Sequence, residues 1–276
     1  MPRALGLLAG TIGMFGGCVT GIRRGVAAIA VAAMLVSGCA SAPESGDAWD
    51  PLETPNRFMF AINKTLDTFI LRPLAVTYRD LTPNGAQRGV RNALNNLGEP
   101  VTAINELAQG EATRAAQTVA RFIVNSTIGL LGLFDVAKDI GLPPTKEDFG
   151  QTIGVWAKAP PEDGGPYLVL PLVGPSNARD AVGLLVDHLV DPFRVAAHHF
   201  DVDWLLYVRT GADAIDSRSR TLQALDDIEK NSVDYYTAIR SAYTQRRAAQ
   251  IRQRGVVATA ALPLSVGGRA ELGLAR

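Results

Sequence analysis

Ser176, two aspartates and two histidines are the residues whose types and order could carry hydrolytic chemistry. Ser176 lies in the segment GPSNA, and Asp187, Asp191, His198 and His199 follow it. Serine, acid and histidine occur in this order in hydrolases that hold the nucleophile at a strand–turn–helix elbow. That fold needs a parallel sheet of many strands, whereas this chain offers one strand-like segment, and helix capping explains Ser176 fully. We therefore predict no enzymatic activity, with a Ser176-dependent hydrolase as an alternative.

The sequence shows no pattern for a metal or a cofactor. His188, His198 and His199 are its only histidines, and no cysteine or spaced carboxylate cluster accompanies them as in zinc or iron sites. Glycine motifs that bind phosphates are also missing. The 27 basic residues balance the 27 acidic ones, so the net charge does not indicate nucleic acid. We expect no metal, no cofactor and no nucleic-acid partner.

The first 38 residues have the composition of a secretory signal. Arg3, Arg23 and Arg24 precede the short apolar run GVAAIAVAAMLVSG, and no acid occurs there. The segment LVSGC, which ends at Cys39, resembles the bacterial lipobox, whose cysteine is lipidated and becomes the N-terminus. We predict a signal peptide at 1–38, a covalent lipid on Cys39 and a flexible tether over 39–48. Cys18 lies in a weaker imitation of the same pattern, inside an unusually long leader.

The residue after the cysteine bears on location. Ala40 stands there and not aspartate, which by resemblance to lipoprotein sorting indicates the outer membrane. The protein is therefore expected on the periplasmic side of a bacterial outer membrane, held by its lipid anchor.

Apolar spacing after Asp50 predicts an all-α domain. Phe58, Ile62, Leu66 and Phe69 share one face of a helix that should begin near Thr54 and stop near Arg72-Pro73. Further helices are expected around Val90 to Leu97, from Glu99-Pro100 to Gly110, from Ala112 onward, from a Ser176 cap to Leu189, over Val208 to Ile228 and after a Ser232 cap. The domain should span 49–250, followed by a basic flexible tail at 251–276.

Prolines and glycines are frequent between Gly141 and Pro175. They exclude regular helix over most of this segment. Tyr167 to Val173 could be extended, but it has no partner strand of similar quality, so a sheet is not expected. We predict an ordered irregular loop that packs on the helices.

The most apolar stretch of the expected mature chain, RFIVNSTIGLLGLFDVA from Arg121 to Ala137, is too short to cross a bilayer. Its 17 residues would make about 25 Å of helix against a hydrocarbon core of about 30 Å. Polar Asn125, Ser126 and Asp135 and two glycines interrupt it. It is either a buried hairpin or an element that enters lipid without spanning.

An ordered series of short motifs resembles the MlaA (VacJ) family of outer-membrane lipoproteins over residues 48 to 250. These motifs are Asp50-Pro51-Leu52-Glu53, Asn56-Arg57, Asn63, Leu66-Asp67, Arg72-Pro73, Tyr78-Arg79-Asp80, Pro83, Gln109-Gly110, Arg121-Phe122, Asn125, Gly129 to Asp135, Phe149 to Gly154, Gly165-Pro166-Tyr167, Pro171, Gly174-Pro175-Ser176, Arg179-Asp180 and Tyr235 to Arg247. The long leader and the tail after about Gly255 depart from the family pattern.

The resemblance implies a single ring-like domain of amphipathic helices with no transmembrane span. It implies a lipoprotein that removes mislocalised phospholipids from the outer leaflet through a central channel, passes them to a soluble periplasmic lipid carrier and so maintains lipid asymmetry. A porin trimer is the implied partner. The alternative is a structural porin-associated lipoprotein without transport activity.

A phospholipid needs a wet path for its headgroup and apolar surroundings for its tails. We expect the turn around Gly129 to Phe134 and the loop from Gly141 to Gly154 to border this path. The candidate residues are Asn125, Gly129, Gly132, Phe134, Asp135, Phe149 and Gly150. A bulky residue at Gly129 or Gly132 is expected to alter lipid movement without unfolding the protein.

Overall fold

Helices dominate the computed structural model, which describes residues 49–260 except 159 and 162. These residues belong to one compact unit, Asp47–Arg276. In chain order the elements are α2 (Glu53–Leu66), the π-helical turn η1 (Asp67–Leu71), α3 (Arg72–Leu81), α4 (Asn84–Ala108), α5 (Ala112–Thr127), α6 (Val136–Asp139), α7 (Phe149–Ala157), β1 (Tyr167–Leu170), β2 (Gly174–Asn177), α8 (Ala178–Val190), α9 (Pro192–His199), α10 (Trp204–Asn231) and α11 (Tyr235–Ala260). The predicted all-α class is confirmed, since the only sheet in the described range is a two-stranded hairpin.

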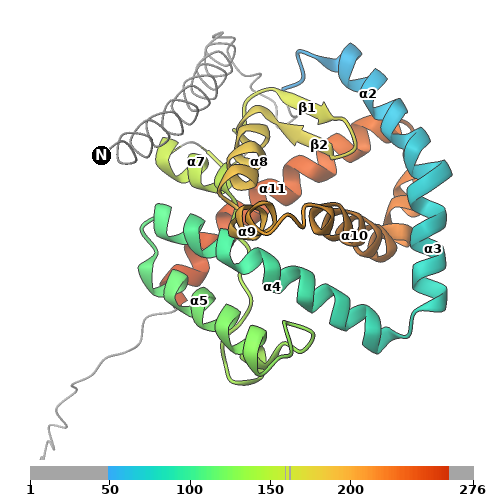
Figure 1. The fold of residues 1–276 in the computed structure, drawn as a ribbon. Helices are drawn as coiled ribbons and strands as arrows, with labels where there is room; N and C mark the ends of the chain where they lie inside the picture. Colours follow the sequence, from blue (N-terminus) through green and yellow to red (C-terminus); the bar gives the residue numbers. More distant parts are fainter. Residues whose placement is uncertain (1–48, 159, 162, 261–276) are drawn as a thin grey trace, which may run out of the picture. The chain divides into compact units, whose positions relative to one another are not determined.

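Within this unit, α2, α3, α4 and α5 follow one another around the periphery, as Figure 1 shows, and α8, α9 and α10 lie inside their course. This order agrees with the expected ring-like arrangement. α4 packs along α5, α7 against α8, and α10 against α3. Among the described helices, none combines the length and the apolarity that a membrane crossing requires.

Several predicted segments fall at the edge of the described range or beyond it. Cys18 and Cys39, the signal peptide and the tether to residue 48 lie outside it, as do residues from 261 onward. The predicted start of the tail at residue 251 falls inside α11, which continues to Ala260.

Two prolines predicted to mark helix boundaries are instead accommodated within continuous helical segments. Pro73 follows η1, whose wider turn, closed by a bond from the Arg72 N–H to the Asp67 carbonyl, lets the chain continue into α3. Pro100 lies inside α4, which runs unbroken from Asn84 to Ala108. A proline removes one backbone donor, and packing of α4 against α5 outweighs this local loss.

Three predicted helix caps are also corrected. Thr54 was the predicted start of α2, but the helix begins at Glu53 and its N-cap is Leu52. Ser232 is the C-cap of α10, and the Asp234 carboxylate accepts from the N–H groups of Tyr236 and Thr237 at the start of α11. For α8 the cap is Asn177, whose Oδ1 accepts from the Asp180 N–H at 2.8 Å. The residue that caps a helix depends on where the preceding segment ends. The spacing of apolar residues does not determine that position to the exact residue.

The 141–175 segment contains regular structure that the sequence did not suggest. β1 pairs antiparallel with β2, with Tyr167 opposite Asn177 and Leu170 opposite Gly174, so the expectation of no sheet was wrong. Leu172 and Gly174 adopt positive φ and close the connection between the strands. The helix α7 occupies the proline-free window 149–157, and the Asp148 carboxylate caps it by accepting from the Gln151 N–H.

The hairpin obtains from α2 the partners that a larger sheet would supply. Asn56 donates to the Tyr167 carbonyl and accepts from the Val169 N–H, each at 2.9 Å. Asn63, two turns further along α2, bonds Leu170 and Leu172 in the same way. Two asparagine side chains thus take the place of a third strand, and this is why a two-stranded sheet is stable here.

The main buried apolar cluster lies where α2, β1 and α11 meet. It comprises Tyr167, Val169 and Tyr236, with Met59, Phe60 and Tyr243 packed around them. The Tyr167 and Tyr236 rings make an edge-to-face contact with centroids 6.0 Å apart. This cluster anchors the last helix to the first described residues.

Candidate functional site

The helices α4 and α5 bury polar side chains and expose apolar ones. The buried residues of α4 are Asn96, Glu99, Thr102, Ala103, Asn105 and Glu106, and those of α5 are Ala115, Thr118, Arg121 and Asn125. In contrast, Leu107 is 59% exposed and Ile123 55%. The polarity is inverted relative to a domain that folds in water, where burial of apolar surface drives packing.

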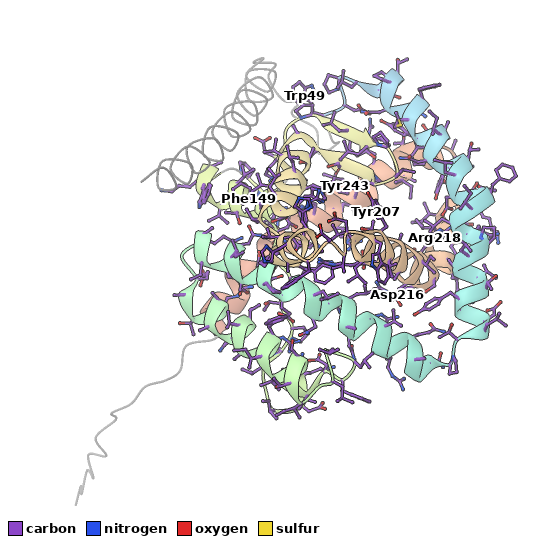
Figure 2. The ribbon with its side chains drawn as sticks, in the orientation of Figure 1. Trp49, Phe149, Tyr207, Asp216, Arg218 and Tyr243 are labelled. Carbon is purple, nitrogen blue, oxygen red and sulfur yellow. The ribbon has the colours of Figure 1, made fainter. Side chains whose placement is uncertain are left out.

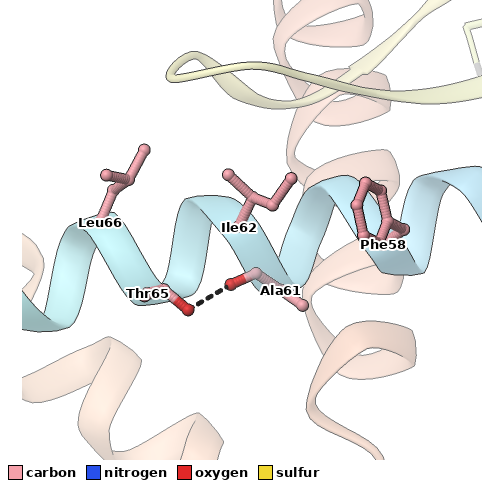
Figure 3. A pocket seen from close by; sticks show the side chains of 5 residues that line it. All are labelled: Phe58, Ala61, Ile62, Thr65 and Leu66. Atoms are coloured by element: carbon pink, nitrogen blue, oxygen red, sulfur yellow. Dashed lines mark hydrogen bonds between the residues drawn. The ribbon is translucent and has the colours of Figure 1, made fainter.

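Exposed apolar side chains continue along α2 and α3. Phe58 of α2 is 67% exposed and Phe69 of η1, the turn between these helices, is 76% exposed, so the face that carries the predicted stripe points outward. A shallow hollow on this face is lined by Phe58, Ala61, Ile62, Thr65 and Leu66, as Figure 3 shows. The Thr65 hydroxyl bonds the Ala61 carbonyl at 2.8 Å, which removes its donor from the surface.

A cavity of about 790 Å³ lies on the inner side of α4 and α5. It is also bordered by the 144–148 segment, α8, α9 and α10. Most of the residues that line it are polar or charged by type, although their apolar atoms also contribute to its surface; the lining residues are Asn92, Leu94, Asn95, Asn96, Gly98, Glu99, Val101, Thr102, Arg121, Asn125, Asp135, Lys138, Pro144, Thr145, Lys146, Glu147, Asp148, Leu184, Asp187, His188, Asp191, Arg194, Leu206, Arg209, Thr210 and Asp213. The polar faces buried by α4 and α5 therefore line an internal space.

Arg121 joins three segments of the cavity wall. Its guanidinium bonds Glu99 and Asp135, each at 3.1 Å, and also the Leu142 carbonyl. Asn125 donates to the same Asp135 carboxylate at 3.0 Å. Burial raises the pKa of Glu99, an effect that the nearby Arg121 opposes. One buried cation thus holds two carboxylates at the wall.

The opposite wall carries a second set of charges. Arg209 of α10 pairs with Asp191 at 2.5 Å and so fixes the start of α9. Asp187 accepts from the Asn105 side chain at 2.8 Å and from the Phe149 N–H at 3.0 Å, while burial raises its pKa. His188, which contacts Arg194, has a pKa lowered by burial and by this arginine. A neutral His188 is therefore favoured at pH 7.

Buried charge also fixes α10 against its neighbours. Asp216, 1% exposed, accepts from Arg91 of α4 at 3.4 Å and from Arg220 at 3.0 Å. Arg218 pairs with Asp67 of η1 at 2.7 Å. Figure 2 labels Asp216 and Arg218, which lie along α10 near α4 and α3. One ion pair therefore joins α10 to α4 and another joins it to η1. These two contacts fix the position of the cavity wall that α10 supplies.

Hydrogen bonds and an ion pair hold the 142–148 segment against α4 and α5. Thr145 donates to Glu106 at 2.9 Å, and Thr118 donates to the other oxygen of the same carboxylate at 2.7 Å. Glu147 accepts from Arg114 at 2.8 Å. The irregular segment that was predicted to pack on the helices does so through buried polar side chains.

Arg247 of α11 closes the same region from the other side. It bonds Asp148 at 2.5 and 2.7 Å and Asp180 at 2.7 and 3.0 Å. The Tyr243 hydroxyl, labelled in Figure 2, also donates to Asp180. Burial acts against ionisation of Asp148, but the Arg247 guanidinium outweighs it and lowers the pKa of this carboxyl. We call Arg247, Asp148 and Asp180 the α11 clamp.

Among the predicted site residues, Asn125 and Asp135 line the cavity and bond each other. Phe134 is 59% exposed on the neighbouring turn. Phe149 packs edge-to-face on Trp156, and Gly150 lies against the clamp residue Asp180. Gly129 and Gly132 shape the turn between α5 and α6. Whether these residues contact a lipid stays a prediction.

The expectation that Gly129 or Gly132 would tolerate a bulky residue was wrong. A Cβ on Gly129 would lie 2.3 Å from the Phe134 carbonyl oxygen and 2.5 Å from that of Asn125. Gly132 has a φ of +89°, and its Cβ would lie 2.5 Å from the Asn96 Cβ. Substitution at either position would disrupt the turn itself.

The hydrolase alternative loses its geometric basis. Ser176 lies buried in β2, and its hydroxyl donates to the Asn177 carbonyl at 3.3 Å. His198 pairs instead with Asp203 at 3.3 Å on the surface. Within the described residues, His, Cys, Asp and Glu side chains also form no cluster suited to a metal ion.

Sequence reasoning missed most of the cavity wall. Asn92, Asn96 and Glu99 recur at helical spacing along α4, opposite its apolar positions. A polar stripe on a helix usually faces solvent, so this pattern by itself does not indicate a cavity wall. The usable signal was the density of asparagine on one face, because amides offer both donors and acceptors for a buried network.

Comparisons with known proteins bear on this arrangement. A model of the family described as "MlaA lipoprotein" matches residues 48–250. The "Intermembrane phospholipid transport system lipoprotein MlaA" of Escherichia coli (strain K12) is 32% identical over 230 residues, 80% of this chain and 86% of that one. An uncharacterized protein of Rickettsia felis is 38% identical over 208 residues, 75% of this chain and 79% of its own length.

A solved structure described as "Structural basis for maintenance of bacterial outer membrane lipid asymmetry" is also similar. It is 33% identical, has a TM-score of 0.62, and the match covers 73% of this chain and 98% of that one. The family match contains every residue named above as lining the cavity.

Proposed function

The chain belongs to the MlaA lipoprotein family, and from that membership we propose that it is a component of an intermembrane phospholipid transport system. It removes mislocalised phospholipid from the outer leaflet of a bacterial outer membrane through the cavity and passes it to a soluble periplasmic carrier. This activity maintains lipid asymmetry. The names of the E. coli relative and of the similar structure support the proposal.

The inverted polarity of α4 and α5 is the observation that carries the proposal. In water, exposed Leu107 and Ile123 would cost free energy at about 25 cal/mol per Å² of apolar surface. Against hydrocarbon this cost vanishes, whereas Glu99 and Arg121 must be kept away from the lipid. Apolar outer faces and a polar interior are therefore what a domain embedded in one leaflet requires.

The cavity supplies the second environment that a phospholipid needs. Its charged wall suits a headgroup that keeps part of its hydration, and the outer apolar faces suit the acyl chains. We propose further that a lipid on Cys39 anchors the domain on the periplasmic side and that a porin trimer is its neighbour in the membrane. The tether from Cys39 would end at Trp49, whose carbonyl accepts from the Tyr167 N–H.

The transport proposal predicts that a bulky residue on the cavity wall blocks function. Thr210 of α10 lines the cavity. Thr210→Trp should leave as much phospholipid on the cell surface as deletion of the gene, because the indole occupies space needed by the headgroup. Surface phospholipid is measured in a deletion strain that expresses the variant.

Thr221→Trp is the matched control. Thr221 is an exposed threonine of the same helix whose hydroxyl also bonds a backbone carbonyl one turn earlier. This variant should restore wild-type asymmetry. Normal asymmetry with Thr210→Trp would contradict the path, and normal asymmetry in the deletion strain with altered porin complexes would favour the structural alternative.

The anchor has its own test. Cys39→Ala should abolish lipidation and shift the protein from the outer-membrane fraction to the soluble or inner-membrane fraction, because no acyl chain remains to hold it. Cys18→Ala is the control and should leave fractionation unchanged. Metabolic labelling with a fatty acid reads out the modification, and label retained on Cys39→Ala would refute the assignment.

A further inference from the structure

Two buried acceptor atoms on the cavity wall have no donor. Glu99 Oε2 and Asn96 Oδ1 are without a hydrogen-bond partner among the described residues. Glu99 is 4% exposed and Asn96 is 3% exposed, and both line the cavity. An unsatisfied buried acceptor costs about 1–3 kcal/mol, more when it is charged. A ligand that donates hydrogen bonds here would recover this cost.

The other atoms of both side chains are fixed from α5. Glu99 Oε1 accepts from Arg121 Nε at 3.1 Å, and Asn96 Nδ2 donates to Ser126 Oγ at 2.9 Å. The two side chains lie three residues apart on one face of α4, so their Cβ atoms are about 5–6 Å apart. Both free acceptors are thus held in place before a ligand arrives.

The charge at this point favours a cation. Arg121 serves both Glu99 and Asp135, so one positive charge faces two carboxylates and the group carries a net charge of −1. Burial disfavours the ionised form of Glu99 and raises its pKa, and a further positive charge beside it acts in the opposite direction, by favouring the carboxylate. A donor that is also cationic fits this wall better than a neutral one.

Two free cations stand on the same wall. Lys138 and Lys146 line the cavity, are exposed and have no carboxylate partner in the described part of the chain. Lys138 follows Asp135 by three residues, and its own N–H bonds the Asp135 carboxylate. These ammonium groups can donate hydrogen bonds to a phosphate while the acceptors on α4 hold a cation.

We propose that this wall recognises a phospholipid whose headgroup carries a primary ammonium, and that ethanolamine phospholipids are the preferred cargo. The ammonium donates to Glu99 Oε2 and Asn96 Oδ1, and the phosphate faces Lys138 and Lys146. The inference rests on the proposed transport function. A choline headgroup has the charge but no N–H donor, and a glycerol headgroup has no positive charge, so both bind less well.

The test measures which phospholipid the full-length protein takes up. The purified lipoprotein is equilibrated in mixed micelles with equal amounts of phosphatidylethanolamine, phosphatidylcholine and phosphatidylglycerol with identical acyl chains. It is then recovered, and the bound lipids are quantified by mass spectrometry. We expect the wild type to favour phosphatidylethanolamine about tenfold, the factor for one charge-assisted hydrogen bond. Glu99→Gln should bring the ratios near unity while phospholipid still binds.

Glu111→Gln is the matched control, since Glu111 stands at the N-cap of α5 and is not among the residues that line the cavity. It removes the same charge and should keep the preference. If Glu99→Gln fails to fold because Arg121 loses a counterion, Asn96→Asp decides: it adds charge at the second acceptor, where the Ser126 hydroxyl can donate, and should increase the preference.

The outcomes separate this inference from the transport function. Equal recovery of the three lipids by the wild type overturns the headgroup preference and leaves phospholipid binding intact. An undiminished preference in folded Glu99→Gln, or an unchanged one in Asn96→Asp, overturns the assignment to this wall. If no phospholipid is recovered with any variant, the proposed function fails as well.

Discussion

Arg247→Ala should lower the free energy of unfolding by about 3 kcal/mol. Arg247 is the only cation of the α11 clamp, and it is 12% exposed between Asp148 and Asp180. Its loss takes the cation away from Asp148 at the start of α7 and one of two cations away from Asp180 at the start of α8, where Arg179 stays at 3.1 Å. The expected value is at the lower end for buried ion pairs because the Asp148 side chain keeps 34% exposure. Urea unfolding followed by circular dichroism measures it.

The neighbouring Arg246→Ala is the control. Arg246 is an exposed arginine of the same helix and should change stability by less than about 0.5 kcal/mol. A loss of equal size in both variants would show that helix composition, and not the clamp, is responsible.

The destabilisation by Arg247→Ala should also depend on pH. The pKa of Asp148 is lowered in the folded protein. The stability that this carboxylate contributes is therefore present above its unfolded pKa of about 3.9 and is lost as pH falls through the folded value. The difference between wild type and variant should shrink below about pH 4, and a difference that is constant with pH would contradict the clamp.

Gly183→Ala should destabilise the domain by about 3 kcal/mol or prevent folding. A Cβ on Gly183 of α8 would lie 2.2 Å from the Gly150 nitrogen and 2.6 Å from its Cα, at the start of α7. Both contacts are to backbone, so no side-chain rotation relieves them and the two helices must separate. Urea unfolding compares the variant with the wild type.

Gly211→Ala provides the control for Gly183→Ala. Gly211 also lies within a helix, and nothing stands within 4 Å of the position of its Cβ. The alanine should therefore stabilise the protein by about 0.5–1 kcal/mol, through helix propensity. Wild-type stability of Gly183→Ala would show that α7 and α8 can adjust their distance.

The sequence alone was sufficient for the fold class and for the family. Helical spacing of apolar residues predicted most of the helices, including the stripe that contains Phe58 and Ile62 on α2. Local signals are weak at the ends of helices: Pro73 and Pro100 predict helix boundaries, although a π-turn and packing against α5 let the helices continue through them. The hairpin was missed because its stabilising partners, Asn56 and Asn63, come from a helix more than 100 residues earlier.

The candidate site was predictable only in part. Asn125 and Asp135 stood out because they are polar residues inside an apolar stretch, and both line the cavity. Glu99 and Arg209 do not stand out in the sequence, since each lies in an ordinary amphipathic helix and becomes a wall residue only when the helices assemble, and Asp187 stands out only as a candidate for the hydrolase alternative.

What the sequence determined by itself is that these helices have an apolar face and a polar face. Which face points inward was decided by the tertiary structure, where Glu99 and Arg121 are buried while Leu107 and Ile123 are exposed. The physical reason is that the periodicity of apolar residues separates the two faces but does not show whether water, lipid or protein surrounds each of them. In water the apolar face would be buried, whereas next to hydrocarbon the polar face is buried, and the same spacing fits both.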